Sequence, residues 1–198
     1  MNKSQNYMAL DLELNTDADG QTTKIIQVGI AIGNAESPED ILVQKWFINP
    51  QEPLSDHIQA LTGITETNVQ HESTPINQVA DEIGELIQTK KVFVNPIQWG
   101  GGDADELKKL FEDNQIEFPY FGHRIIDVKT FFVFLELANG RSLAGGLRSS
   151  MNKYKLDFIG KPHRADVDAF NTLRFYFFLI ERQRKLETMM QTMKTIKY

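Results

Sequence analysis

Apolar and polar side chains alternate along residues 7–14, which read Tyr-Met-Ala-Leu-Asp-Leu-Glu-Leu. A period of two residues indicates a β-strand, in which side chains two positions apart project from the same face. Residues 24–32 are dense in isoleucine and valine and predict a second strand, buried on both faces. Residues 41–48 predict a third strand. The short joints between these strands predict an antiparallel meander.

The apolar spacing changes after residue 50. Residues 53–63 predict a short helix that ends at Gly63, and Thr65 is placed to cap whatever follows. Residues 75–89 carry apolar side chains at helical spacing, and residues 91–97 return to a strand pattern. A strand, helix and strand joined in this way imply parallel pairing with a right-handed crossover.

The rest of the chain alternates glycine-rich or polar breaks with helical patterns. The triple glycine at 100–102 opens a helix, and Asp127 precedes another helix that we expect it to cap. The remaining elements are expected at 123–128 (strand), 128–137 and 142–151 (helices), and from His163 onward (a last helix that continues into a polar tail, 182–198). The sequence therefore predicts one α/β domain, 1–198, with a mixed five-stranded sheet flanked by helices.

Composition narrows the class of protein. The chain has 198 residues, of which 41% are hydrophobic, and this suits one domain with a sizeable core. It has no cysteine, so disulfides and thiolate chemistry are excluded and a reducing cytoplasm is the expected location. No apolar run is long enough to span a membrane, and we expect no membrane partner. The net charge of −6 argues against a broad basic coat for nucleic acid, although an enzyme that grips only a chain end remains compatible.

Asp11 and Glu13 fall on one face of the first predicted strand. Like charges so close together repel each other and are costly to desolvate unless a cation lies between them. A divalent metal ion is the obvious candidate. The alternative is an edge strand whose polar face meets water, which is common for an isolated Asp-x-Glu. Further acids therefore decide between the two interpretations.

Two later segments supply further candidate groups. Asp103 follows the triple glycine, although Asp103 with Glu106 also fits a reciprocal helix cap. His163 stands five residues before Asp168, so a loop and the first turns of a helix could bring both into one cleft. A single histidine is more often a surface or core residue, but this one completes a set of acids that suggests two-metal phosphodiester hydrolysis.

With these motifs in order, the chain resembles the DnaQ-like 3′-5′ exonucleases of the ribonuclease H-like superfamily, in the subgroup whose signature is Asp, Glu, Asp, Asp and His. Asp11-x-Glu13 matches the first motif, and His163 with Asp168 matches the third. The segment Leu-Thr-Gly-Ile-Thr at 61–65 resembles the part that this family places beside the terminal nucleotide. Ser142, Leu143, Leu147 and Tyr154 resemble the approach to the last motif.

The second motif departs from the family pattern, because glycines stand where an Asn and an aromatic residue are usual, and Asp105 competes with Asp103. Leu107, Leu110 and Phe111 follow Asp103 at helical spacing and place it above a buried stripe, whereas Lys108 and Lys109 follow Asp105. The spacing therefore favours Asp103.

The resemblance implies that Asp11, Glu13, Asp103 and Asp168 hold two Mg²⁺ or Mn²⁺ ions. It also implies that His163 takes a proton from the attacking water, and that the product is a nucleoside 5′-monophosphate released from the 3′ end of single-stranded RNA or DNA. Candidate contacts to the last base are Leu14, Leu61 and Ile64, with Trp99 as a stacking platform; each could instead be ordinary core.

Two alternative functions, the sugar preference and the oligomeric state stay open. A catalytically idle module on the same fold would bind nucleic-acid ends or a protein partner, and a ribonuclease H-like endonuclease would not need His163. The sequence leaves the sugar undecided, with a slight lean toward RNA. A homodimer could lend basic surface to the partner's site through Lys153, Lys155, Lys161 and Arg164, although a solvated loop explains these residues as well.

Overall fold

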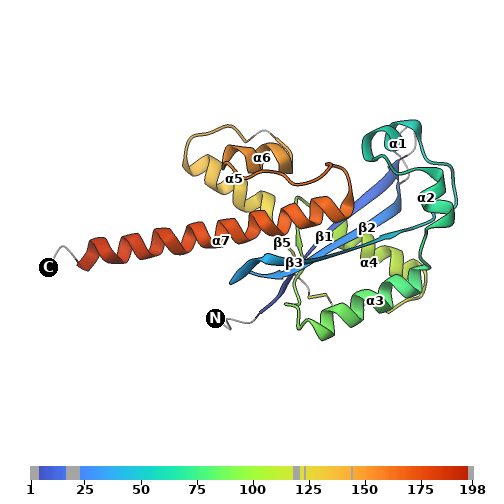
Figure 1. The fold of residues 1–198 in the computed structure, drawn as a ribbon, viewed down its shortest axis with the longest axis horizontal. Coiled ribbons are helices and arrows are strands. Elements are labelled where there is room, and N and C mark those ends of the chain that lie inside the picture. Colours follow the sequence, from blue (N-terminus) through green and yellow to red (C-terminus); the bar gives the residue numbers. More distant parts are fainter. Residues whose placement is uncertain (1–4, 17–22, 118–120, 123, 144, 196–198) are drawn as a thin grey trace.

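One mixed sheet organises the molecule (Figure 1). The computed structural model describes residues 5–16, 23–117, 121–122, 124–143 and 145–195. The strand order is β3-β2-β1-β4-β5, with β1 antiparallel to β2, β2 antiparallel to β3, and β4 parallel to both β1 and β5. The strands are β1 (Tyr7–Thr16), β2 (Thr23–Asn34), β3 (Ser37–Phe47), β4 (Ile97–Gln98) and β5 (Ile126–Asp127). The predicted sheet, a meander followed by parallel strands, is confirmed.

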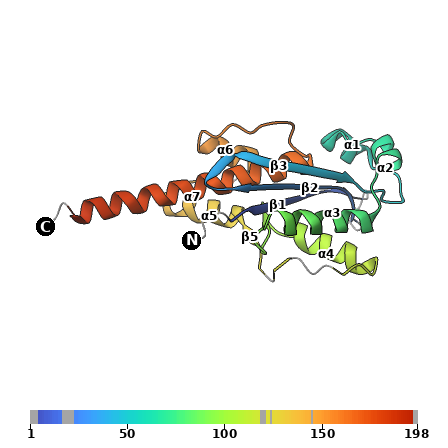
Figure 2. The same ribbon diagram turned by 60° about the horizontal axis from the view of Figure 1, so that its bottom comes forward.

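Helices cover both faces of this sheet. Helices α3 and α4 lie on one face and the first half of α7 lies along the other (Figure 2). The helices are α1 (Asp56–Thr62), α2 (Glu66–His71), α3 (Ile76–Thr89), α4 (Asp103–Asp113), α5 (Val128–Ala138), α6 (Leu147–Lys153) and α7 (Ala165–Thr195).

The pleat of β1 decides which side chains meet which layer. Leu10 and Leu12 pack into the core formed with α3 and α4, whereas Ala9 packs into the core formed with α5, α6 and α7. Since neighbouring residues of a strand point to opposite faces, Asp11 and Glu13 share the face of Ala9, toward α7. Strand β2 is buried along most of its length, as its apolar sequence predicts.

Several predicted elements are shorter than expected. The strand predicted at 91–97 is reduced to β4, which begins after Pro96, a residue with no N–H to donate to a ladder. The strand predicted at 123–128 is reduced to β5, and His123 lies outside the described residues. The helix predicted at 142–151 begins only at Leu147, because Gly145 adopts a left-handed φ of 130° and Gly146 is extended.

Other local predictions are confirmed. Gly63 ends α1 in the left-handed conformation, and Thr65 caps α2 in a reciprocal pair with Asn68. Asp127 caps α5 by accepting a hydrogen bond from the backbone N–H of Lys129. The capping role considered for Asp103 is not seen, because it is the first residue of α4 and no side chain caps that helix.

Helix α7 extends well past the sheet (Figure 1). Its projecting half exposes Met189, Met190 and Met193, each of them between 56% and 61% exposed. As far as Thr195, the polar tail predicted from the sequence is thus the outer end of one continuous helix. Within the described residues, no helix is both long and apolar enough to cross a membrane.

Candidate active site

The first two acids are fixed by the pairing of β1 with β2. Asp11 lies opposite Gly29 and Glu13 lies opposite Gln27, and a bulge follows between Glu13 and Leu14. Residues directly opposite each other in an antiparallel pair project from the same face. The two carboxylates therefore emerge beside a glycine and a glutamine, on the face over which α7 begins.

Helix α7 adds the third carboxylate. Oxygen atoms from Asp11, Glu13 and Asp168 all lie within 4.8 Å of one another. These acids come from the first and last parts of the sequence, and only the packing of α7 on the strands unites them. Hard oxygen donors at such a separation are the ligands that Mg²⁺ and Mn²⁺ prefer.

The three clustered carboxyl groups have raised pKa values. Burial, followed by the neighbouring charges of Asp103, Asp168 and Glu13, raises the pKa of Asp11 well above its ordinary value. Burial and the charge of Asp168 raise the pKa of Glu13 to about 8, although Arg164 partly opposes this. Burial also raises the pKa of Asp168. Each of these charges makes ionisation of the others more costly, so the donor set fits a divalent ion, whose positive charge would offset the repulsion.

Asp103 approaches the group from the start of α4. It is half-buried, and burial raises its pKa to about 7, while its own charge contributes to the raised pKa of Asp11. Asp105 is exposed. The geometry thus brings Asp103, rather than Asp105, toward the other acids, although Asp103 stays outside the group whose oxygens lie within 4.8 Å of one another.

The glycine turn before Asp103 is fixed by hydrogen bonds with the side chains of Gln98 and Asp127. Gly100 and Gly102 have φ values of 85° and 117°, which a residue with a side chain rarely adopts. The Gly100 N–H donates to Asp127 at 2.9 Å, and the buried Gln98 side chain donates to the Gly100 carbonyl at 2.6 Å and accepts from the Ala104 N–H at 3.2 Å. The glycines therefore serve a tight turn that sets the start of α4.

His163 stands at the rim, just before α7. Its backbone has a φ of 62°, so it cannot be the first residue of the helix, which begins at Ala165 instead. The His163 N–H donates a 2.9 Å hydrogen bond to Oδ2 of Asp168, and the side chain is exposed. The spacing of five residues thus does bring His163 and Asp168 together.

A cleft of about 750 Å³ opens above these groups, a volume typical of small-molecule sites. His163 and the three clustered acids line it, as do Leu61 and Trp99. Sequence reasoning did not single out the polar side chains that helix α6 contributes, Arg148, Ser149 and Asn152. The signal for them was weak, because their helix was predicted five residues too early.

Comparison with known proteins agrees with this geometry. The RNase T exonuclease family model matches residues 8–176, from the second residue of β1 into the first half of α7. The chain belongs to the RNase T exonuclease family. This confirms the resemblance to DnaQ-like exonucleases that the motifs indicated.

Several relatives of this family member are informative. The chain is 26% identical over 201 residues to the 3′-5′ exonuclease DinG of Bacillus subtilis (strain 168); this covers 94% of the chain but only 19% of that relative. The nuclease domain of 3′hExo, a DEDDh family member solved with rAMP, has a TM-score of 0.75 at 18% identity, covering 91% of this chain and 94% of that one. Escherichia coli exonuclease I with a dT13 oligonucleotide has a TM-score of 0.69 at 14% identity, covering 93% and 43%. At these identities the structures show a shared fold.

Of the four apolar residues expected to contact the terminal base, Leu61 and Trp99 line the cleft. Leu61 is 38% exposed and lines the cleft. Trp99 also lines the cleft, but its ring packs against Phe132 and Phe175 with centroids 5.8 and 5.9 Å away, so it also belongs to the core.

The other two expected base contacts lie elsewhere. Ile64 is fully buried in a cluster with Ile26 and Phe47, which favours the alternative that it is an ordinary core residue rather than a contact of the terminal base; it is buried because Gly63 turns the chain inward. Leu14 is partly buried and packs against the core shared with α3 and α4. The bulge after Glu13 precedes it, and it is not among the residues that line the cleft.

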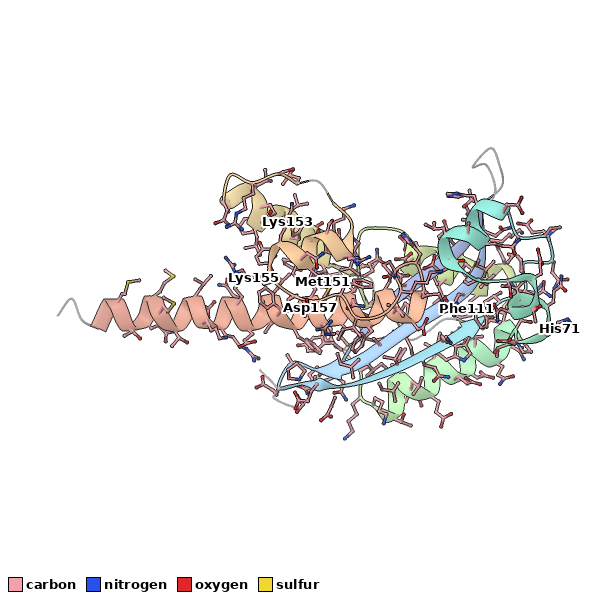
Figure 3. The ribbon with its side chains drawn as sticks, turned by 45° about the horizontal axis from the view of Figure 1, so that its top comes forward. His71, Phe111, Met151, Lys153, Lys155 and Asp157 are labelled. Carbon is pink, nitrogen blue, oxygen red and sulfur yellow. The ribbon has the colours of Figure 1, made fainter. Side chains whose placement is uncertain are left out.

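The loop between α6 and α7 closes one rim of the cleft. Figure 3 shows it running along α7 past Lys155 and Asp157. Arg174 of α7 donates to the Asp157 carbonyl at 2.9 Å, and Lys161 reaches across to the Thr62 carbonyl of α1 at 3.2 Å. This last contact ties the loop to the helix that carries Leu61.

The basic residues expected to form one patch are dispersed. Lys153 pairs with the buried Glu136 of α5 at 3.4 Å, and Lys161 lines the cleft. Arg164 lies over the Phe47 ring at 5.6 Å and 4.0 Å from Asp166. Lys153, Lys161 and Arg164 thus all have partners within their own chain, Lys161 through the Thr62 carbonyl described above.

Proposed function

We propose that this chain is a metal-dependent 3′-5′ exonuclease that releases nucleoside 5′-monophosphates from the 3′ ends of single-stranded nucleic acid. The observation that carries the proposal is the group formed by Asp11, Glu13 and Asp168, whose oxygens lie within 4.8 Å of one another at a cleft. Membership of an exonuclease family supports the reaction class. The DinG relative supports the direction, since it is named a 3′-5′ exonuclease.

Four acids would hold the metal. Asp11, Glu13 and Asp168 would supply the close donors, and Asp103 would supply a further carboxylate from α4. Two ions, Mg²⁺ or Mn²⁺, suit this number of hard ligands. When bound, they would stabilise negative charge on the scissile phosphate and on the departing 3′ oxygen.

His163 would act as the general base. Its imidazole is exposed at the rim of the cleft, and its backbone is anchored to Asp168. It would accept the proton of the attacking water and release it to solvent, to which it is open. A residue in this position can exchange protons with solvent between turnovers.

The cleft walls suggest how the chain end is held. Leu61 offers exposed apolar surface to the terminal base, and Trp99 offers part of a ring; base stacking of this kind tolerates any sequence. Arg148 on α6 adds a positive side chain for the backbone phosphates. The 3′hExo structure holds rAMP, a ribonucleotide, and the exonuclease I structure holds a DNA oligonucleotide. The substrate test for this chain therefore includes both RNA and DNA ends.

The decisive experiment uses oligonucleotides labelled at the 5′ end, as matched RNA and DNA, with Mg²⁺ or Mn²⁺. We expect stepwise shortening from the 3′ end, a mononucleotide product identified by mass, and loss of activity with EDTA or in Asp11→Asn. Internal fragments that precede any mononucleotide would point to an endonuclease. Intact oligonucleotide together with tight end binding would point to a catalytically idle binding module. A cytoplasmic location and a homodimer remain predictions from the sequence.

A further inference from the structure

Two residues of β2 face the start of α7 and have no part in the proposed chemistry. Gln27 is the cross-strand partner of Glu13, and Gly29 is the cross-strand partner of Asp11. Both therefore project from the face that carries the acids. Their contacts show what they do there.

Gln27 anchors the first residue of α7. Its side chain is fully buried, and its Oε1 accepts a 3.0 Å hydrogen bond from the backbone N–H of Ala165. The first N–H groups of a helix have no partner inside the helix and need an outside acceptor. In this protein the acceptor comes from β2, the strand paired with β1 beside Glu13, 138 residues away in sequence. The hydrogen bond therefore ties the residue opposite Glu13 to the segment that carries the third motif.

Gly29 allows the same helix to approach the sheet. A Cβ atom added at Gly29 would lie 2.1 Å from the carbonyl carbon of Ala165 and 2.2 Å from the backbone nitrogen of Asp166. Both neighbours are backbone atoms and cannot turn away as a side-chain end could. Any residue other than glycine would therefore push the first turn of α7 off the sheet.

The remaining contacts at this helix start are weaker. Lys45 of β3 pairs with Asp166 at 3.5 Å, with 44% of the lysine side chain exposed. Partly exposed ion pairs contribute about 0–1 kcal/mol, whereas leaving a buried N–H without an acceptor costs about 1–3 kcal/mol. Gln27 and Gly29 thus dominate the placement of the helix start.

We propose that Gln27 and Gly29 are positioning residues that fix Asp168, one helical turn beyond Ala165, against Asp11 and Glu13. The inference rests on the proposed function, because it concerns how the metal ligands are held. Groups that orient metal ligands typically contribute 10–100-fold to metal affinity. Loss of either contact should therefore appear first as weaker metal binding.

The test compares Gln27→Met, which keeps the volume but removes the acceptor, with Gln27→Glu, which keeps an acceptor oxygen in either protonation state. Gly29→Ala tests the close approach. Gly33→Ala is the matched control, because it lies on the same strand but away from the start of α7. The atoms nearest to its added Cβ are the Ile41 side chain at 3.0 Å, the Phe177 side chain at 3.3 Å and the Asp40 carbonyl at 3.4 Å. Mn²⁺ affinity is measured by electron paramagnetic resonance, alongside thermal melting and kcat at saturating oligonucleotide.

We expect Gln27→Met to weaken Mn²⁺ binding about 10-fold, with a single cooperative melt and with kcat partly recovered at high Mn²⁺. Gln27→Glu should restore affinity to within about 3-fold, Gly29→Ala should weaken it at least as much as Gln27→Met, and Gly33→Ala should leave it unchanged. If Gly29→Ala fails to fold, the Mn²⁺ affinities of Gln27→Met and Gln27→Glu still test the inference. Folded Gln27→Met with wild-type Mn²⁺ affinity would overturn the inference alone, whereas a wild-type protein that binds no Mn²⁺ would overturn the proposed function with it.

Discussion

The backbone N–H of His163 donates a 2.9 Å hydrogen bond to Oδ2 of Asp168. One carboxylate thus belongs to the acidic group and also holds the residue that would act as the base. Because His163 has a left-handed φ of 62°, this bond also stabilises a backbone conformation that is costly for a residue with a side chain.

Two substitutions should separate the roles of these residues. In His163→Ala, the base is lost and the acids remain, so we expect kcat to fall about 10²–10⁴-fold while Mn²⁺ affinity changes little. In Asp168→Asn, the amide oxygen can still accept the His163 N–H, but the charge is lost, so Mn²⁺ affinity and kcat should both fall. Rates from single-turnover digestion and Mn²⁺ titration measure the two effects.

A matched control for the histidine is available on α2. His71 is exposed at the end of α2 (Figure 3) and is not among the residues that line the cleft. His71→Ala should retain wild-type kcat. Equal losses in the two histidine variants would argue against a specific role for His163.

The second motif can be tested by a pair of substitutions two residues apart. Asp103 is half-buried and its charge acts on Asp11, whereas Asp105 is exposed on the same helix. Asp103→Asn should lower activity at least about 100-fold, because a charged group that stabilises the transition state contributes about 3 kcal/mol or more. Asp105→Asn should stay within 2-fold of wild type, roughly the scatter expected for a surface change. The reverse order in a digestion assay would make Asp105 the ligand.

The raised pKa of Glu13 predicts a pH dependence of stability in metal-free protein. In the folded state Glu13 keeps its proton up to about pH 8, whereas in the unfolded chain it loses it near 4.5. The folded state therefore binds more protons between these pH values, so stability falls as pH rises from about 4.5 to 8. Thermal melts in EDTA should show this decline, and Mn²⁺ should reverse it.

Glu13→Gln removes the group responsible for part of that decline. At pH 8 without metal, we expect this variant to melt about 2–4 °C above wild type, which corresponds to roughly 1 kcal/mol in a chain of this size. It should also be inactive, since a ligand is lost. A lower melting temperature than wild type would contradict the view that the acids repel one another in the absence of metal.

Leu61 offers a test of substrate binding that leaves the chemistry intact. Its side chain is 38% exposed at the cleft, so a base that covers it would remove further apolar surface from water. Leu61→Ala should weaken oligonucleotide binding about 3–10-fold, or about 1 kcal/mol, with kcat little changed. Fluorescence anisotropy with an inactive Asp11→Asn background measures the affinity. Leu42→Ala on β3, where the side chain is 36% exposed, is the control and should bind as the parent does.

The local patterns in the sequence predicted the sheet, the pair formed by Asp11 and Glu13, and the cap at Asp127. Each of these follows from a short period or a single residue beside a helix. The contacts that assemble the site could not be predicted in this way. Gln27 and Ala165 lie 138 residues apart, and nothing in a nine-residue strand pattern distinguishes an anchoring glutamine from a buried polar residue.

Two of the departures from these expectations have physical causes as well. Ile64 follows a glycine in the left-handed conformation, and that turn sends the side chain into the core rather than toward the cleft. The helix that carries Arg148 was misplaced, because helical periodicity does not reveal that Gly145 has a left-handed backbone.

The far end of helix α7 offers an attachment site that is remote from the cleft. Twenty-five residues separate Asp168 from Met193 along one helix, which corresponds to about 38 Å at 1.5 Å per residue. Position 193 is 59% exposed and distant from the cleft. A cysteine placed there would be the only thiol in the chain, so a fluorophore or a surface tether could be attached at one defined point, and digestion could be followed on single immobilised molecules with the catalytic end facing solution.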